Sequence, residues 1–216
     1  AGVQQFLVRA QLGDAAVDDH SDAVGVDARF SRPYGVVIGA APSREDCMHR
    51  RTLVGLPAML IPAAALIAEA AQTLEPLCRE KGVDFSVCAD VGDVMIVGSR
   101  KALGGALLNL LENALQASEG RHDGSAKVCL NAVVDERNVL IHVQDSGKGI
   151  APEVQARIFE PFFTTRGQGT GLGLAIALGV ARAHGGTIEV SSVAGQGSDF
   201  VLRLPAATMT EEKSTQ

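Results

Sequence analysis

Apolar residues return every three or four positions along three stretches of the chain, as they do on one face of a helix. We therefore predict helices over residues 63–81, 100–118 and 171–184. Gly82 is suited to closing the first helix, because glycine readily takes the left-handed conformation found just past helix ends. Pro76 lies inside that helix and predicts a kink or a division there.

Short runs rich in β-branched and apolar residues lie between these helices, separated by turn residues. The expected strands are residues 34–38, 84–89, 95–97, 127–134, 139–144, 187–193 and 199–204. The pair 127–134 and 139–144 and the pair 187–193 and 199–204 are each joined by a short turn, which predicts two hairpins. Such an alternation of strands and helices favours a two-layer α/β sandwich, with helices on one face of a single mixed sheet.

The sequence divides into three parts by pattern. Residues 1–62 show no clear period and are expected to form a poorly defined extension, residues 63–205 form the domain, and residues 206–216 are expected to be a disordered tail. The apolar run over residues 53–68 is too short and too interrupted by proline to span a bilayer, so we expect no membrane segment in this chain and a cytoplasmic location.

Composition narrows the classes of function. The net charge is −6 and no basic stripe is visible, which argues against a nucleic-acid partner. The four cysteines form no CxxC pair, so neither a disulfide framework nor a zinc site is indicated.

Two glycine clusters bracket an apolar segment between residues 145 and 174. The second cluster precedes a predicted helix, whose first turn offers unpaired N–H groups and a positive dipole end to a phosphate. No GxxxxGK[ST] string is present, and no strand leads directly into GQGTGLG, so neither a Walker loop nor a dinucleotide fold is indicated.

Asn109 and Asn113 lie four residues apart on the apolar helix over residues 100–118. Residues four apart share a helix face, so the two amides project together. Amide oxygens suit a hard cation such as Mg²⁺.

Four motifs stand in one order along the chain: Asn109 with Asn113, DSGKG from Asp145, FEPFFTT from Phe159, and GTGLG from Gly169. In this order and wording they resemble the four boxes of the sensor histidine kinase ATP-binding domain, over residues 63–205. The FEPFFTT string is similar to that of nitrogen-regulation and flagellar-type kinases. The resemblance implies the Bergerat fold, a two-layer α/β sandwich.

The resemblance also implies roles for single residues. Asn113 is expected to coordinate Mg²⁺, Asn109 to lie on the phosphate side, and Asp145 to accept the exocyclic amine of adenine. The implied ATP-binding residues, which include both catalytic asparagines, are Asn109, Asn113, Asp145, Gly147, Gly149, Ile150, Phe159, Thr165, Arg166, Gly169, Thr170, Gly171, Leu172, Gly173, Leu174 and Ser198.

Each assignment has a structural alternative. Asn113 could be a buried amide satisfied by backbone, and Asp145 could simply initiate a turn. Arg166 could be solvated instead of binding phosphate, and Ser198 could be a hairpin serine instead of a water-mediated base contact. Glu112 is expected to be solvated.

Phenylalanines 159, 162 and 163 are expected to anchor a lid. Lys148 is expected to be exposed.

The resemblance implies ATP and Mg²⁺ as cofactors, with a histidine-bearing dimerisation domain and a response regulator as partners. An acceptor histidine of this family is followed by an acidic residue and a proline on a long helix. None of the five histidines fits that pattern, and His184 is expected to cap the end of its helix.

Two rival functions remain. The first is an ATPase of the gyrase and Hsp90 type, which uses a glutamate where Asn109 stands. It is disfavoured, because an amide cannot take a proton from water. The second is a catalytically silent nucleotide-binding module that signals by docking.

Overall fold

The computed structural model describes residues 37–38, 59–119, 125–166 and 169–207. The elements in these ranges are β1 (Val37–Ile38), β2 (Met59–Pro62), α1 (Ala63–Glu80), β3 (Asp84–Asp90), β4 (Met95–Gly98), α2 (Arg100–Ser118), β5 (Lys127–Asp135), β6 (Asn138–Asp145), α3 (Pro152–Gln155), α4 (Gly173–Ala183), β7 (Thr187–Val193) and β8 (Gly197–Pro205). The predicted extension and tail lie almost entirely outside these residues.

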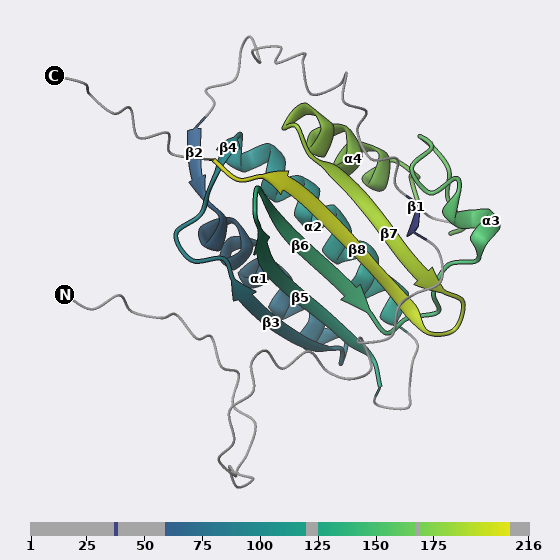
Figure 1. Ribbon diagram of the computed structural model, residues 1–216. Helices are drawn as coiled ribbons and strands as arrows, with labels where there is room; N and C mark the ends of the chain where they lie inside the picture. Colours follow the sequence, from purple (N-terminus) through teal and green to yellow (C-terminus); the bar gives the residue numbers. More distant parts are fainter. Residues whose placement is uncertain (1–36, 39–58, 120–124, 167–168, 208–216) are drawn as a thin grey trace, which may run out of the picture. The chain divides into compact units, whose positions relative to one another are not determined.

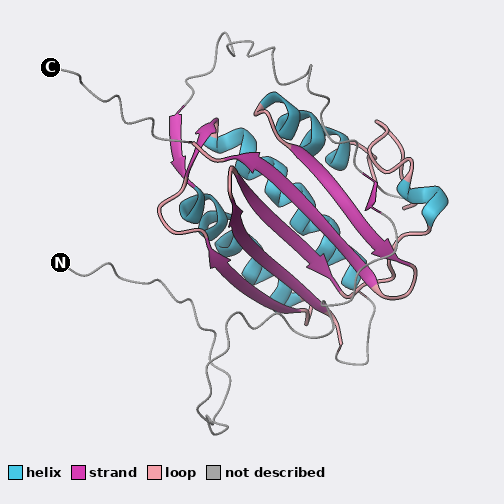
Figure 2. Ribbon diagram, in the orientation of Figure 1, coloured by secondary structure: helices cyan, strands magenta, loops and turns pink. Residues whose placement is uncertain are grey.

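The main sheet has six strands in the order β1-β7-β8-β6-β5-β3. Strand β3 runs parallel to β5, and the other neighbouring strands are antiparallel, so the sheet is mixed as predicted. Helices α1, α2 and α4 lie along the same face of this sheet (Figures 1 and 2). The predicted two-layer α/β sandwich is confirmed.

One predicted strand joins a different sheet. Strand β4 was expected in the single mixed sheet, but it pairs with β2, which was not predicted, in a separate two-stranded ribbon. Ile61 and Ile96 lie opposite each other in this ribbon, and each is 1% exposed. Burial of this cross-strand pair stabilises the ribbon, and no local sequence pattern reveals such a pairing.

Of the two outcomes predicted at Pro76, a kink or a division, the helix is not divided: α1 continues through the proline, with Leu74 and Cys78 on either side of it buried in the core. One helix boundary differs from the prediction by more than one residue. Helix α4 begins at Gly173, two residues later than expected, since Gly171 has a left-handed φ of 66°. Among the described residues, no helix is long and apolar enough to cross a membrane.

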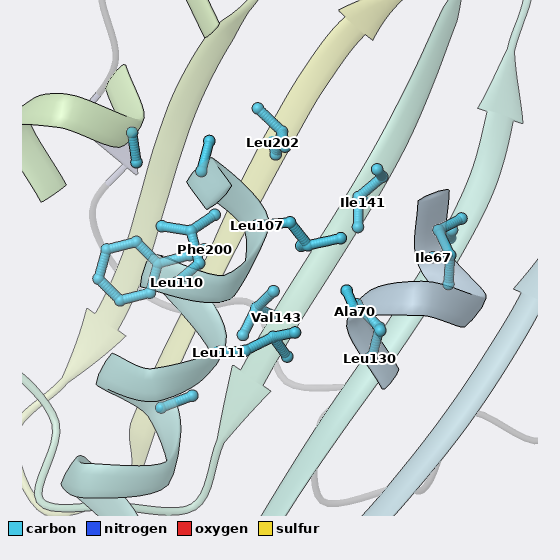
Figure 3. Packing of buried hydrophobic residues seen from close by; sticks show 14 of the residues in the cluster. Ile67, Ala70, Leu107, Leu110, Leu111, Leu130, Ile141, Val143, Phe200 and Leu202 are labelled. Atoms are coloured by element: carbon cyan, nitrogen blue, oxygen red, sulfur yellow. The ribbon is translucent and has the colours of Figure 1, made fainter. Parts of the chain in front are cut away.

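The core lies between the helices and the sheet. The apolar face predicted for α2 is buried there, with Leu103, Leu107, Leu110 and Leu111 each 0% exposed. Figure 3 shows Leu107 and Leu111 among side chains from β5, β6 and β8. Each fully buried leucine of this kind contributes about 1.5–3 kcal/mol. This burial fixes which face of α2 meets the sheet, and so which polar residues lie on its other face.

Candidate functional site

A cavity of about 780 Å³ opens beside α2, at the edge of the sheet where β6 ends and β8 begins. All of the predicted binding residues line it except Gly147, Phe159 and Leu172. The structure therefore brings together residues from α2, the end of β6, the glycine-rich segment before α4, and β8.

One end of the cavity is built from the two asparagines on α2. The Asn113 Nδ2 donates to the backbone carbonyl of Asn109 at 2.8 Å. That bond orients the amide so that its Oδ1 accepts from Arg166 Nη1 at 3.2 Å. Asn113 is thus only half satisfied by backbone, and its oxygen is directed to the cavity side.

Arg166 reaches α2 from 50 residues or more along the chain. Its guanidinium donates to Asn113 Oδ1, to the Asn113 carbonyl at 3.4 Å and to Gln116 Oε1. It is held against the cavity wall and is not freely solvated. Gln116 was not predicted, although its position three residues after Asn113 on the same helix face offered a signal.

The other end of the cavity is built around Asp145, the last residue of β6. Its side chain is 1% exposed and accepts from the Gly147 backbone N–H at 2.8 Å. Burial raises the pKa of this carboxyl from 3.8 to about 6, although hydrogen bonds from Gly147 and Ser198 and the charge of Arg166 oppose the rise. Because the pKa lies below neutral, the carboxylate is an acceptor at pH 7.

The glycines near Asp145 are required mainly by neighbouring backbone. A Cβ on Gly147 would lie 2.3 Å from the Ala117 carbonyl oxygen, at the last turn of α2. A Cβ on Gly149, whose φ is 64°, would lie 2.0 Å from the Val193 carbonyl oxygen. Gly149 also lines the cavity, whereas Gly147 fixes the approach of this loop to α2.

Two buried polar residues that sequence reasoning missed hold the loop after Asp145. Ser192 Oγ accepts from the Ile150 N–H at 2.9 Å and donates to the Gly197 carbonyl at 2.8 Å. Gln155 Nε2 donates to the carbonyls of Ile150 and Ser192 at 2.8 and 2.9 Å. No local pattern marks these residues, because their partners come from three different elements.

The lid phenylalanines divide into two groups. Phe159 and Phe163 pack against the core, as expected of anchors. The Phe162 side chain is 74% exposed, so the prediction that it anchors the lid is wrong. Its backbone has a φ of 68° and its N–H donates to the Gly171 carbonyl at 2.9 Å, which ties together the two ends of the segment between them.

The remaining polar predictions fall as follows. Glu112 and Lys148 are both exposed, and both line the cavity. Among the described residues, no group of three or more His, Cys, Asp or Glu could hold a metal ion.

Of the five histidines, the structure describes His142 and His184 only; His20, His49 and His122 lie outside the described residues. His142 is on β6, with Nδ1 3.1 Å from an Asp199 carboxylate oxygen. His184 follows α4, and its Nδ1 lies 2.7 Å from the Val180 carbonyl, a helix-end contact of the kind predicted.

The family comparison agrees with this geometry. A sequence model described as "Histidine kinase-, DNA gyrase B-, and HSP90-like ATPase" matches residues 98–208, which is half of the chain. The chain belongs to this family.

Its relatives include sensor histidine kinases. The chain is 48% identical over 99 residues to sensor histidine kinase ZraS of Escherichia coli K12, covering 46% of this chain and 20% of ZraS. It is 38% identical over 141 residues to the signal transduction histidine-protein kinase AtoS of the same strain, covering 65% of this chain and 23% of AtoS. The chain thus spans about a fifth to a quarter of the length of these relatives. The narrower similarity to nitrogen-regulation and flagellar-type kinases stays a prediction.

Solved structures show the same fold. The catalytic domain of histidine kinase ThkA matches with 30% identity and a TM-score of 0.62, over 69% of this chain and 96% of that domain. Full-length ShkA in complex with AMPPNP matches with 32% identity and a TM-score of 0.62, over 71% of this chain and 32% of ShkA. The ATP-binding catalytic domain that the four motifs predicted is confirmed.

Proposed function

We propose that the chain binds Mg·ATP in the cavity beside α2 and donates the γ-phosphoryl group to a histidine on a separate domain or chain. The observation that carries this proposal is the polarity of the cavity. A buried carboxylate acceptor, Asp145, lies at one end, and amide oxygens with a guanidinium, Asn113 and Arg166, lie at the other.

The Asp145 end suits an adenine ring. Its carboxylate accepts hydrogen bonds, and the exocyclic amine of adenine donates one where guanine has a carbonyl oxygen. Ile150 and Phe200 line the same cavity and offer apolar surface to the ring. A charge-assisted bond at a buried site contributes about 1.5–3 kcal/mol, enough to favour adenine.

The asparagine end suits the triphosphate. Once Arg166 moves from Asn113 Oδ1 to the phosphates, that oxygen would hold Mg²⁺ together with phosphate oxygens, and the ion would supply charge neutralisation for the transferring group. Gly173, at the N-terminus of α4, lies close to Asn109, because a Cβ there would be 3.6 Å from Asn109 Oδ1. The first turn of α4 therefore presents N–H groups beside the asparagines, where phosphate is stabilised. Arg166 adds a charge that can follow the phosphates.

Transfer to an acceptor is favoured over hydrolysis. Asn109 has an amide where a hydrolase of this family needs a base, and the only carboxylate at this part of the described cavity wall, Glu112, is exposed. What the domain contributes is positioning and charge, so an imidazole brought to the γ-phosphorus would serve as nucleophile.

The partners follow from that chemistry. A histidine-bearing dimerisation domain would present the imidazole, and a response regulator would take the phosphoryl group onward. A cytoplasmic location belongs to the same proposal, because ATP is available there.

A transfer assay tests the proposal. The chain is incubated with Mg²⁺ and γ-labelled ATP, with and without a separately prepared acceptor helix pair from a sensor histidine kinase relative. We expect acid-labile label on the acceptor and none on the chain itself, because none of its five histidines has the acceptor pattern.

Three results would contradict it. Label on the chain that disappears when one of its histidines is replaced would make the domain self-sufficient. Rapid release of phosphate without an acceptor would favour the ATPase rival. Tight binding of ATP with no transfer to any acceptor would favour the silent module. The Asn113→Ala variant serves as the control that lacks the proposed metal ligand.

A further inference from the structure

His184 links α2 and α4, two neighbouring helices that both contribute residues to the wall of the cavity. It directly follows α4, and its Nε2 accepts from the backbone N–H of Ser99 at 3.1 Å. Its Nδ1 is 2.7 Å from the Val180 carbonyl, one turn back in α4. Since a carbonyl can only accept, Nδ1 carries the proton and Nε2 is the bare acceptor. Both ring nitrogens are therefore used, one within α4 and one across to α2.

The position of Ser99 makes this hydrogen bond important for α2. It is the N-cap of α2, with its Oγ accepting from the Ala102 N–H at 3.4 Å. The bond to His184 is thus donated by the residue directly before the helix that carries Asn109 and Asn113.

Gly98 makes room for the imidazole. A Cβ on Gly98 would lie 2.3 Å from His184 Cδ2 and 2.8 Å from Nε2. These approaches are closer than real carbon contacts, so any side chain at residue 98 would push the ring away from Ser99. Gly98 has no left-handed φ, so its lack of a side chain is explained by the space around it, which the imidazole fills most closely and Leu103 Cδ1, 3.0 Å from such a Cβ, limits further.

The link has a counterpart at the other end of the helix pair. Helices α2 and α4 lie side by side on the sheet (Figure 1). His184 meets Ser99 at the start of α2, and Gly173 meets Asn109 ten residues later. From Gly173 to His184 is eleven residues, so the two spans are nearly equal, roughly 15 and 17 Å at about 1.5 Å per residue. The helices are antiparallel, with one contact near each end of the shared length.

We infer that His184 is a positioning residue that sets the register of α4 on α2, and thereby the distance between the first turn of α4 and the two asparagines. This inference rests on the proposed function of those asparagines. A slip of one residue would displace Gly173 by about 1.5 Å along α2, which is enough to misplace N–H donors that must meet the same phosphates as Asn113. Gly98 is required for this contact, because its lack of a side chain leaves space for the His184 ring.

The alternative is that His184 only caps its own helix. Two substitutions separate these roles. In His184→Asn the shorter amide can replace Nδ1 and keep the bond to Val180, but it does not reach Ser99. In His184→Gln the amide oxygen extends to about where Nε2 lies, so the bond across to Ser99 can be kept.

Nucleotide affinity is the readout, measured by calorimetry with two ligands on the full chain. Mg·AMPPNP uses both ends of the cavity, whereas AMP lacks the β- and γ-phosphates that α4 and the asparagines would hold. We expect His184→Asn to weaken Mg·AMPPNP roughly 3- to 10-fold, the effect of about one hydrogen bond, with AMP changed less than about twofold. We expect His184→Gln to stay within about twofold of the unaltered chain for both ligands.

Gly98→Ala supplies an independent check that leaves His184 in place. Alone it should reproduce the loss seen in His184→Asn, because the ring is displaced. Combined with His184→Asn it should add little, since the ring is no longer there to clash. Thermal melting of every variant confirms that each is folded at the assay temperature.

The outcomes separate this inference from the proposed function. If the unaltered chain binds no Mg·AMPPNP, the proposed function fails, and the role of His184 fails with it. If the unaltered chain binds Mg·AMPPNP but the Asn and Gln variants bind it equally well, His184 is only a helix cap. An equal loss of AMP and Mg·AMPPNP affinity would likewise contradict a role in register.

Discussion

Replacing Asp145 with asparagine should make the nucleotide-free protein more stable while lowering its affinity for adenine nucleotides. The side chain is 1% exposed, so its charge has lost most of the stabilisation by water. An asparagine has the same shape, and its amide oxygen can still accept the 2.8 Å hydrogen bond from the Gly147 N–H. The substitution therefore removes the charge, and it also replaces one carboxylate oxygen by an NH2 group that cannot accept the hydrogen bonds from Ser198.

The size of the effect follows from the pKa. Burial raises the pKa of Asp145 from 3.8 to about 6. Each pKa unit corresponds to about 1.4 kcal/mol, so ionising this carboxyl in the folded protein costs roughly 3 kcal/mol more than in the unfolded chain. At pH 7 we expect Asp145→Asn to raise the free energy of unfolding by about 1–3 kcal/mol, less whatever the contact with Ser198 loses.

The size of this gain in stability depends on pH. Because the folded-state pKa lies above the unfolded value, the folded protein holds the proton more tightly. The stability contributed by Asp145 is fully present below about pH 4 and is lost as the pH rises through about 6. The variant has no such group, so its advantage should be small at pH 4 and complete at pH 7.

Nucleotide affinity should move in the opposite direction. The carboxylate is the proposed acceptor for the adenine amine, and its loss should weaken ATP binding by about 1.5–3 kcal/mol and reduce the preference for ATP over GTP. In the unaltered protein, ATP affinity should rise as the pH increases through about 6, as the carboxyl ionises.

The assay combines melting curves at pH 4 and pH 7 with competition binding of ATP and GTP at pH 7. A gain of about 1 kcal/mol raises the melting temperature of a domain of this size by roughly 2–4 °C. A variant that is less stable than the unaltered protein at pH 7 would refute the reasoning from burial. Unchanged discrimination between ATP and GTP would place the adenine contact elsewhere.

Further predictions concern the asparagine end, the glycines and the lid. Asn113→Ala should abolish most of the gain in ATP affinity that Mg²⁺ provides, without loss of the fold; calorimetry with and without Mg²⁺ checks this, and an unchanged gain would reject the metal assignment. Gly147→Ala should destabilise the protein by more than 1 kcal/mol or so, because the added Cβ meets backbone at 2.3 Å. Gly105→Ala, a matched control in the α2 interior where a Cβ meets nothing within 4 Å, should stabilise it by about 0.5–1 kcal/mol; denaturant unfolding compares the two, and equal effects would contradict the steric argument. Amide exchange at residues 164–166 should slow on adding Mg·AMPPNP, since Arg166 gains phosphate contacts, and exchange that does not change would argue against a lid.

Local patterns in the sequence were enough to find the three long helices and most strands, although the four-residue helix α3 was not predicted. The apolar face of α2 can be predicted because leucines recur at helical spacing. The four-residue spacing of Asn109 and Asn113 likewise places them together on one face. The glycine-rich strings are continuous along the chain, so their resemblance to the family could be recognised. That resemblance in turn predicted most of the residues that line the cavity. Each of these signals depends on residues that are near one another in sequence.

The contacts between distant segments were decided only by the tertiary structure. Arg166 meets Asn113 and Gln116, and His184 meets Ser99 across 85 residues of sequence. The pairing of β4 with β2 and the raised pKa of Asp145 have the same origin. A sequence pattern reports period and turn chemistry, whereas partners and burial depend on how the helices and the sheet pack, and that packing brings together residues with no local relation.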